Sequence, residues 1–272
     1  MTEIINDLQD MRYLQWTRTR KSSGTAGSFL KSYDDTGERK LYYKLSDYDS
    51  LKGITGHECV NEIVAQRLLT LMNIPHLEYR LIHALVDIED HTYDTYLCES
   101  YDFKNRDEAK ITLEDYYEME RIPGETPIEF CKRMGWEKYI FSMLTIDFLI
   151  HNRDRHGANI EVLFDRKERS VRPAPLFDHG VSFLCRCGSK EEISGFDVMS
   201  DLKVQSFVGT NSAFDNIRLV KPSFFETVRK INDSDREYVV SGLECVLSIE
   251  HIDKIWEMIR RRQDYIDNLR NT

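Results

Sequence analysis

Apolar and polar residues alternate in short runs through the first part of the chain, a pattern that is typical of strands. The strands predicted from these runs are residues 11–17, 28–33, 39–45, 77–88 and 93–99. A turn at 34–38 joins the second strand to the third, and the last two form a hairpin around 89–91. Residues 56–72 instead space their apolar side chains along one face of a helix.

From Lys104 to Glu129 the composition turns acidic and helical, and the rest of the chain is mainly helical. The helices predicted there are 114–121, 127–134, 136–150, 222–231, 238–247 and 249–269. A proline opens the helix at 222–231, and a capping box at 234–237 precedes the next one. The shift in composition predicts a boundary between two lobes, residues 1–103 and 104–272.

A polar loop, residues 151–159, lies between the apolar helix 136–150 and a short strand-like run. The loop offers the carboxylate of Asp154 and the carboxamide of Asn159, and the carboxylate of Asp178 follows later. Rigid elements often hold catalytic groups on loops of this kind. In protein-kinase-like phosphoryl transfer, the first Asp accepts the hydroxyl proton, while the Asn and the second Asp hold Mg²⁺. Magnesium is a hard cation that prefers such oxygen ligands.

A loop of small residues precedes the two strands of the first hairpin, and the second of these strands carries Lys44. The loop residues that would cover nucleotide phosphates are Ser23, Gly24, Thr25, Ala26, Gly27 and Ser28. Lys44 would pair with α- and β-phosphate oxygens, although such a loop is also typical of a plain hairpin connection. Glu58 or Glu62 could reach Lys44 from the following helix, and we favour Glu62 because it lies deeper in the helix.

The 272 residues suffice for one large domain or two lobes, and their net charge of −10 does not favour a nucleic-acid surface. The N-terminus is acidic and lacks the apolar core of a signal peptide, and no apolar run is long enough to span a membrane. The six cysteines form no zinc signature. These features predict a cytoplasmic protein with reduced thiols, without direct contact to nucleic acid or membrane.

With these residues in place, the sequence resembles the HipA-like kinase family. The resemblance rests on Asp154-x-His156-x-x-Asn159, on Pro-x-x-Asp178, and on the small-residue loop before Lys44. It implies an α+β, bilobal protein-kinase-like fold with a small antiparallel-sheet N-lobe carrying one helix, and a mainly helical C-lobe. It also implies a serine/threonine protein kinase that uses ATP and Mg²⁺.

The resemblance assigns a role to each candidate residue. Asp154 would be the catalytic base, Asn159 and Asp178 would bind Mg²⁺, and Lys44 would hold the ATP phosphates. The remaining assignments are backbone hydrogen bonds to adenine from Glu99 and Tyr101, proximity to the ribose for Asp102, and contact with nucleotide or support of the loop for His156.

Two positions depart from the family pattern, which often has Gly after the catalytic Asp and Lys before the Asn. Here these places hold Arg155 and Ala158. Arg155 could replace the missing lysine at the transferred phosphate, or it could face solvent. The resemblance also implies a protein substrate and leaves open a neutralising partner protein, as in toxin–antitoxin pairs. The extra N-terminal region of long members is not expected in this chain.

Three other functions remain open on the residues alone. A metal phosphohydrolase would use metal ligands drawn from His151, Asp154, His156, Asp178 and His179. An aminoglycoside-type small-molecule phosphotransferase shares the Asp-to-Asn spacing, and the acidic stretch 107–129 could attract a cationic substrate. A nucleotide-binding pseudokinase could act as an interaction module.

The small-residue loop also suggests regulation, because its hydroxyl groups would lie near a transferable phosphate. The hydroxyl residues between 22 and 28 follow a basic approach at 18–21. A phosphate there would add about −1.5 to −2 charges and repel the ATP triphosphate. We therefore hypothesise autophosphorylation that switches the enzyme off; the alternative is that these residues are only small loop residues.

Overall fold

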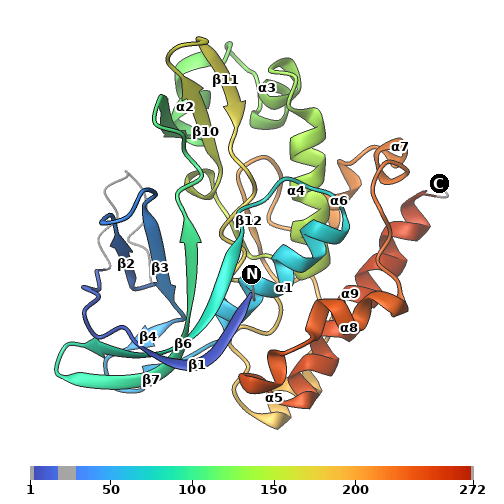
Figure 1. The fold of residues 1–272 in the computed structure, drawn as a ribbon. Coiled ribbons are helices and arrows are strands. Elements are labelled where there is room, and N and C mark those ends of the chain that lie inside the picture. The colour runs from blue at the N-terminus through green and yellow to red at the C-terminus, as the bar shows by residue number, and fades with distance from the viewer. Residues whose placement is uncertain (1–2, 18–28, 271–272) are drawn as a thin grey trace.

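The structure is a computed structural model that describes residues 3–17 and 29–270. A five-stranded sheet from the N-terminal part lies beside a mainly helical C-terminal part (Figure 1). The α+β fold class predicted from the sequence is therefore confirmed. The small-residue loop at 22–28 lies outside the described residues.

The strands and helices have the following bounds. The strands are β1 (Ile4–Asp10), β2 (Lys31–Asp34), β3 (Leu41–Leu45), β4 (Tyr48–Asp49), β5 (Gly53–Ile54), β6 (Tyr79–Ile88), β7 (His91–Tyr101), β8 (Glu108–Thr112), β9 (Asp154–Arg155), β10 (Glu161–Asp165), β11 (Ser170–Pro173) and β12 (Gln205–Ser206). The α-helices are α1 (Glu58–Leu71), α2 (Leu113–Glu120), α3 (Pro127–Arg133), α4 (Glu137–Ile150), α5 (Lys190–Gly195), α6 (Ala213–Arg218), α7 (Pro222–Phe225), α8 (Arg236–Val240) and α9 (Ile249–Arg270). The 3-10 helices are η1 (Gly157–Asn159), η2 (Asp233–Asp235) and η3 (Leu243–Cys245).

The large sheet has the strand order β1-β6-β7-β3-β2. Three of its pairings are antiparallel, as predicted, but β1 pairs with β6 in parallel, so the sheet is mixed. The strand predicted at 11–17 is wrong, because the first strand is Ile4–Asp10. Met11 and Leu14 are both buried, and this spacing of three suits a turn better than a strand.

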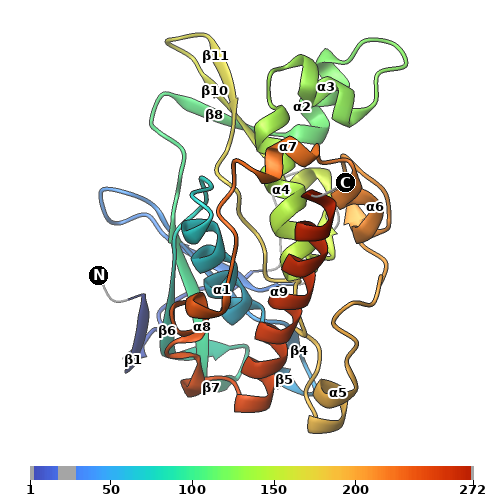
Figure 2. The same ribbon diagram turned by 90° about the vertical axis from the view of Figure 1, so that its right-hand side faces the viewer.

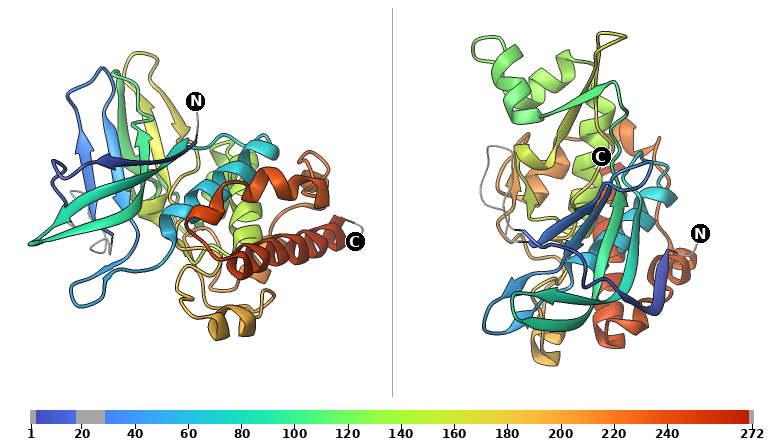
Figure 3. Two further views of the ribbon diagram at one scale, coloured as in Figure 1. Left: turned by 60° about the horizontal axis from the view of Figure 1, so that its bottom comes forward. Right: turned by 60° about the vertical axis from the view of Figure 1, so that its left-hand side comes forward.

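Helix α1 lies between the sheet and the C-terminal helices (Figure 3). Residues of α1 share one continuous hydrophobic core with β6 on one side and with α4 and α9 on the other. Figure 2 shows α9 running alongside α4, which closes the far side of this core. Because α1 is enclosed in this way, even its charged residues Glu58 and Glu62 are buried. The helix therefore carries carboxylates into the interior, next to β3.

Several element boundaries in the C-terminal part differ from the prediction. Residues 108–112 form β8 rather than helix, because they pair with β10 in a three-stranded sheet. Helix α7 is a single turn, since the Thr227 hydroxyl bonds the carbonyl of Phe224 and competes with helix extension. The reciprocal cap before α8 joins Asn232 and Asp235 instead of the residues 234–237 predicted.

Candidate active site

The polar loop after α4 begins at His151, which takes a left-handed conformation with φ of 52° and ends the helix. The loop then forms the short strand β9, which pairs in parallel with β12, and the 3-10 turn η1. His156 caps this turn, because its Nδ1 accepts a hydrogen bond from the Ala158 N–H at 3.2 Å. This hydrogen bond supports the loop, and the expected contact of His156 with nucleotide stays a prediction.

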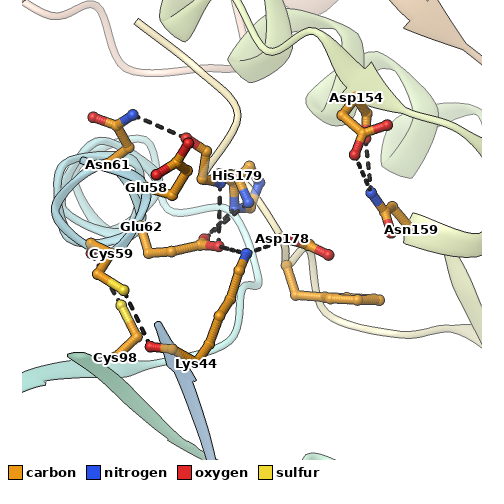
Figure 4. Close-up of polar contacts among 12 residues, drawn as sticks. Lys44, Glu58, Cys59, Asn61, Glu62, Cys98, Asp154, Asn159, Asp178 and His179 are labelled. Atoms are coloured by element: carbon orange, nitrogen blue, oxygen red, sulfur yellow. Dashed lines mark hydrogen bonds and ion pairs between the residues drawn. The ribbon is translucent and has the colours of Figure 1, made fainter. Parts of the chain in front are cut away.

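Asp154 and Asn159 face each other across this loop. The Asn159 amide nitrogen donates to the Asp154 carbonyl at 2.8 Å and lies 3.4 Å from the Asp154 carboxylate (Figure 4). The Asp154 side chain is 32% exposed, so a substrate hydroxyl could approach it. Because the Asn159 nitrogen points at Asp154, its amide oxygen is the atom that would contact a metal ion.

Lys44 joins two carboxylates from distant parts of the chain. Its Nζ lies 3.0 Å from Glu62 on α1 and 2.6 Å from Asp178 (Figure 4). Burial would lower the pKa of Lys44, but the negative charges of Asp178 and Glu62 outweigh it and hold the pKa above its usual value. Glu58, the other glutamate considered from the sequence, accepts a backbone hydrogen bond from Asp47 instead.

Glu62 also holds the segment that follows Asp178. Its carboxylate accepts backbone hydrogen bonds from His179 at 2.8 Å and from Gly180 at 3.1 Å. Burial would raise the pKa of Glu62, yet the charge of Lys44 and the bond from His179 keep the pKa below its usual value. The close approach favours glycine at 180, because a Cβ there would lie 3.2 Å from Lys44 Nζ and 3.0 Å from the Glu58 Cβ, closer than most such contacts.

A cavity of about 500 Å³ opens above Lys44 and Asp178. Its walls come from the large sheet, from the chain that leaves β7 and from the segment before Asp178. The lining residues are Lys31, Tyr42, Tyr43, Lys44, Leu77, Tyr79, Cys98, Ser100, Tyr101, Asp102, Phe103, Lys110, Glu161, Phe177 and Asp178. Aromatic and other apolar side chains interspersed with charged groups are typical of small-molecule sites.

The register of β7 gives different surroundings to Glu99 and Tyr101, the two residues expected to bond adenine. A two-residue loop closes the β6–β7 hairpin, and from this loop hydrogen-bonded pairs alternate with non-hydrogen-bonded pairs along the two strands. In this alternation Arg80 and Glu99 form a hydrogen-bonded pair. The backbone of Glu99 is therefore used within the sheet, and its side chain accepts a hydrogen bond from Arg80 at 2.7 Å. Glu99 does not line the cavity, and its expected contact with adenine stays a prediction.

Tyr101 lies two residues further along β7, so its backbone N–H and C=O point to the same side as those of Glu99. On that side, the first residue of β6 is Tyr79, and its partner is Ser100. No residue of β6 therefore pairs with Tyr101. Tyr101 lines the cavity, as does Asp102, whose carboxylate lies 2.9 Å from Lys110 Nζ. Both residues therefore lie at the cavity, and their expected contacts with adenine and ribose stay predictions.

The oxygen ligands at this site fit magnesium held together with a nucleotide. Asp178 offers a carboxylate and Asn159 an amide oxygen, and Mg²⁺ usually takes only one or two protein ligands beside phosphates and water. Among residues 3–17 and 29–270, no group of three or more His, Cys, Asp or Glu side chains could hold a metal ion by itself. The ligand set expected for a metal phosphohydrolase is therefore not assembled in the described residues.

Arg155 has neither of the positions considered for it from the sequence. It is 2% exposed, so it does not face solvent, and its guanidinium is paired with Asp147 on α4 at 2.9 Å. It therefore points beneath the loop instead of toward a transferred phosphate. Sequence reasoning missed the role of Asp147, although a carboxylate inside an apolar helix was a signal that a buried partner exists.

No family model and no curated protein matches this sequence. Among solved structures, the chain is similar to the proinflammatory kinase CtkA of Helicobacter pylori, with a TM-score of 0.65 and 14% identity over 96% of both chains. It is also similar to HipA of Shewanella oneidensis MR-1, in a complex with HipB and operator DNA, at a TM-score of 0.38 and 13% identity over 92% of this chain and 67% of that one. WaaP in complex with acyl carrier protein gives a TM-score of 0.39 and 12% identity over 93% and 90%.

These similarities establish the fold and nothing finer. The match to CtkA spans almost the whole chain, so this protein has the fold of that kinase. The other two TM-scores are too low to support an argument. Within the described residues, no helix has the length and apolar character needed to cross a membrane.

Proposed function

We propose that this protein is a kinase that transfers the γ-phosphate of ATP to a serine or threonine hydroxyl of another protein. The observation that carries the proposal is the meeting of Lys44, Glu62 and Asp178, two of which, Lys44 and Asp178, line the 500 Å³ cavity. A buried lysine paired with a helix carboxylate, next to a second carboxylate, is the arrangement that protein kinases use for phosphoryl transfer. The kinase fold of CtkA supports it.

In this proposal the nucleotide occupies the cavity between two lobes, residues 1–103 and 104–272. The backbone of Tyr101 bonds the adenine, Asp102 lies near the ribose, and Lys44 contacts the α- and β-phosphates. Residues 23–28 cover the phosphates. Magnesium, when bound by Asn159 and Asp178, would offset the negative charge of the phosphate oxygens.

The chemical step is assigned to Asp154. Its carboxylate accepts the proton of the substrate hydroxyl, the hydroxyl oxygen forms a bond to the γ-phosphorus, and the bond to the β-phosphate oxygen breaks, releasing ADP. The charge of Lys44 stabilises negative charge on the phosphates throughout. Autophosphorylation between residues 22 and 28, and a neutralising partner protein, remain proposals that rest on the sequence.

The experiment compares wild type with Asp154→Asn, using radiolabelled ATP. The substitution keeps the shape of the side chain and removes the charge that orients the hydroxyl. We expect unchanged ATP affinity and phosphotransfer reduced by about 10²-fold or more, the scale of a positioned general base. Asp90→Asn, in the turn between β6 and β7, is the control and should keep full activity.

The same assay separates the alternatives. Label on a protein supports the proposal, and label on an added aminoglycoside supports a small-molecule phosphotransferase. Nucleotide binding without transfer would indicate a pseudokinase. Equal phosphotransfer by wild type and Asp154→Asn would show that Asp154 is not the base.

A further inference from the structure

Arg155 is a charged side chain buried directly beneath the polar loop. Its Nε and Nη2 each donate to a different oxygen of the Asp147 carboxylate, and both distances are 2.9 Å. A guanidinium and a carboxylate in this two-bond arrangement fix each other's orientation, not only their distance. Because Asp147 belongs to the rigid helix α4, this pair anchors the Arg155 side chain to the scaffold of the C-terminal part.

The remaining nitrogen of Arg155 connects two segments that lie far apart in sequence. Nη1 donates to the carbonyl of Asn159 at 3.1 Å and to the carbonyl of Phe177 at 2.7 Å. Asn159 is one of the two candidate magnesium residues, and Phe177 directly precedes the other, Asp178. Since both carbonyls bond the same nitrogen of a planar group, Arg155 sets the spacing between the two metal-binding segments.

Asp147 extends the same network to the candidate base. Its carboxylate accepts a third hydrogen bond, from the Asn152 side-chain amide at 2.9 Å. The Asn152 side-chain oxygen accepts a hydrogen bond from the backbone N–H of Asp154 at 3.1 Å. One buried carboxylate therefore fixes the backbone of Asp154 through Asn152, and the two metal-binding segments through Arg155.

A second buried arginine shows that this arrangement is not a general feature of the fold. Arg262 on α9 is also fully buried and donates to three carbonyls, those of Val198, Phe148 and Ser200. It has no carboxylate among these hydrogen-bond partners, and burial lowers its pKa to about 10. Burial would also lower the pKa of Arg155, but Asp147 outweighs it and holds the pKa above its usual value.

We propose that Arg155 and Asp147 are positioning residues for magnesium: they hold Asn159 and Asp178 at the separation that lets both contact one ion. This inference rests on the proposed function, since it concerns the ion that accompanies ATP. Groups that orient metal ligands without touching the metal typically change metal affinity by about 10- to 100-fold when they are altered.

The test measures ATP binding by calorimetry at increasing Mg²⁺ concentrations, with the full chain. Arg155→Lys keeps the charge, but a single ammonium group cannot bond both carboxylate oxygens and both carbonyls. We expect it to raise the Mg²⁺ concentration that gives half-maximal enhancement of ATP binding by about 10-fold or more. ATP binding in the presence of a chelator should remain within about twofold of wild type.

Arg262→Lys is the matched control, because it weakens an equally buried arginine that bonds backbone carbonyls away from the metal-binding segments. It should lower the thermal midpoint without changing the Mg²⁺ requirement. Asp147→Asn is a second test variant, which keeps the side-chain volume and should raise the Mg²⁺ requirement as Arg155→Lys does.

Three results would overturn the inference. An unchanged Mg²⁺ requirement in either folded test variant would show that the network does not position the ion. An equal rise in Arg262→Lys would show that any loss of packing has the same effect. If the ATP affinity of wild type does not respond to Mg²⁺ at all, the proposed function itself fails, and this inference fails with it.

Discussion

At the scale of single residues, buried charges at this site occur in compensated groups. Lys44 has Glu62 and Asp178, and Arg155 has Asp147. An unpaired charge in such surroundings would cost several kcal/mol, so each group constrains where its partners can lie. This is why a substitution that removes one charge is expected to disturb the neighbours as well.

Some residues of the candidate site are predictable from the sequence, and others are not. The chemistry of magnesium and phosphate sets the order and spacing of Asp154, Asn159 and Asp178, and this pattern can be recognised in the amino-acid sequence. The pairing of Arg155 with Asp147 depends on how α4 and the loop fold back on each other. No spacing rule reports this, so Arg155 was expected at a phosphate or in solvent.

The choice of Glu62 over Glu58 gives a prediction at this scale. Glu62→Gln removes the charge that compensates Lys44 but keeps a side chain of the same size. We expect Lys44 to lose its orientation and the ATP dissociation constant to rise about tenfold, which corresponds to about 1.4 kcal/mol. Calorimetric titration with ATP measures it.

Glu58→Gln is the control for this prediction, since Glu58 lies one helical turn away and bonds the backbone of Asp47 instead of Lys44. Its ATP affinity should stay near that of wild type. A larger loss in Glu58→Gln than in Glu62→Gln would reverse the assignment.

At the scale of elements, the best-predicted segments are those whose own residues carry the full apolar and polar pattern of a helix or hairpin. The hairpin β6–β7 and the helices α1, α4 and α9 all carry a long, regular pattern, and the structure confirms them. β8 was missed because its strand state depends on pairing with β10, which is about fifty residues away. The same limit applies to the contact of Glu99 with Arg80, because it follows from the register of β7, which the sequence alone does not show.

The junction between α1 and the segment after Asp178 gives a prediction at this scale. Gly180→Ala would place a Cβ 3.0 Å from the Glu58 Cβ and 3.2 Å from Lys44 Nζ, so α1 or Lys44 must move. Overpacking of this kind typically costs about 1–3 kcal/mol. We expect a lower thermal midpoint and weaker ATP binding, measured by thermal unfolding with and without ATP.

Gly188→Ala provides the comparison for Gly180→Ala, because a Cβ at Gly188 meets nothing within 4 Å. It should leave both the thermal midpoint and the effect of ATP close to wild type. If Gly180→Ala behaves in the same way, the contact between α1 and this segment is not as tight as the structure indicates.

At the scale of the whole molecule, one core joins the large sheet, α1 and the C-terminal helices. The predicted division at residue 103 therefore separates two groups of elements that share packing through α1. A group buried in this shared core has a different pKa in the folded protein than in the unfolded chain. Its protonation is therefore linked to the stability of the fold.

His151 provides the prediction at this scale. Burial, with the nearby charges of Arg262 and Arg153, lowers its pKa from 6.5 to about 3. At pH values between these two pKa values, His151 binds a proton in the unfolded chain but not in the folded protein. The contribution of His151 to stability is therefore fully present above about pH 6.5 and is lost as the pH decreases toward 3. For one group the loss is up to about 1.4 kcal/mol per pH unit, or about 2 kcal/mol between pH 6.5 and 5.

His151→Asn removes this titration and suits the left-handed backbone at the end of α4, which Asn tolerates well. We expect it to be less stable than wild type at pH 7.5, because packing is lost, but to lose less stability on going to pH 5. Urea unfolding at both pH values measures the difference. His179 and His251 also have lowered pKa values, so part of the wild-type acid sensitivity should remain. An identical loss of stability in wild type and His151→Asn would mean that His151 accepts a proton in the folded protein, against the burial that the structure gives it.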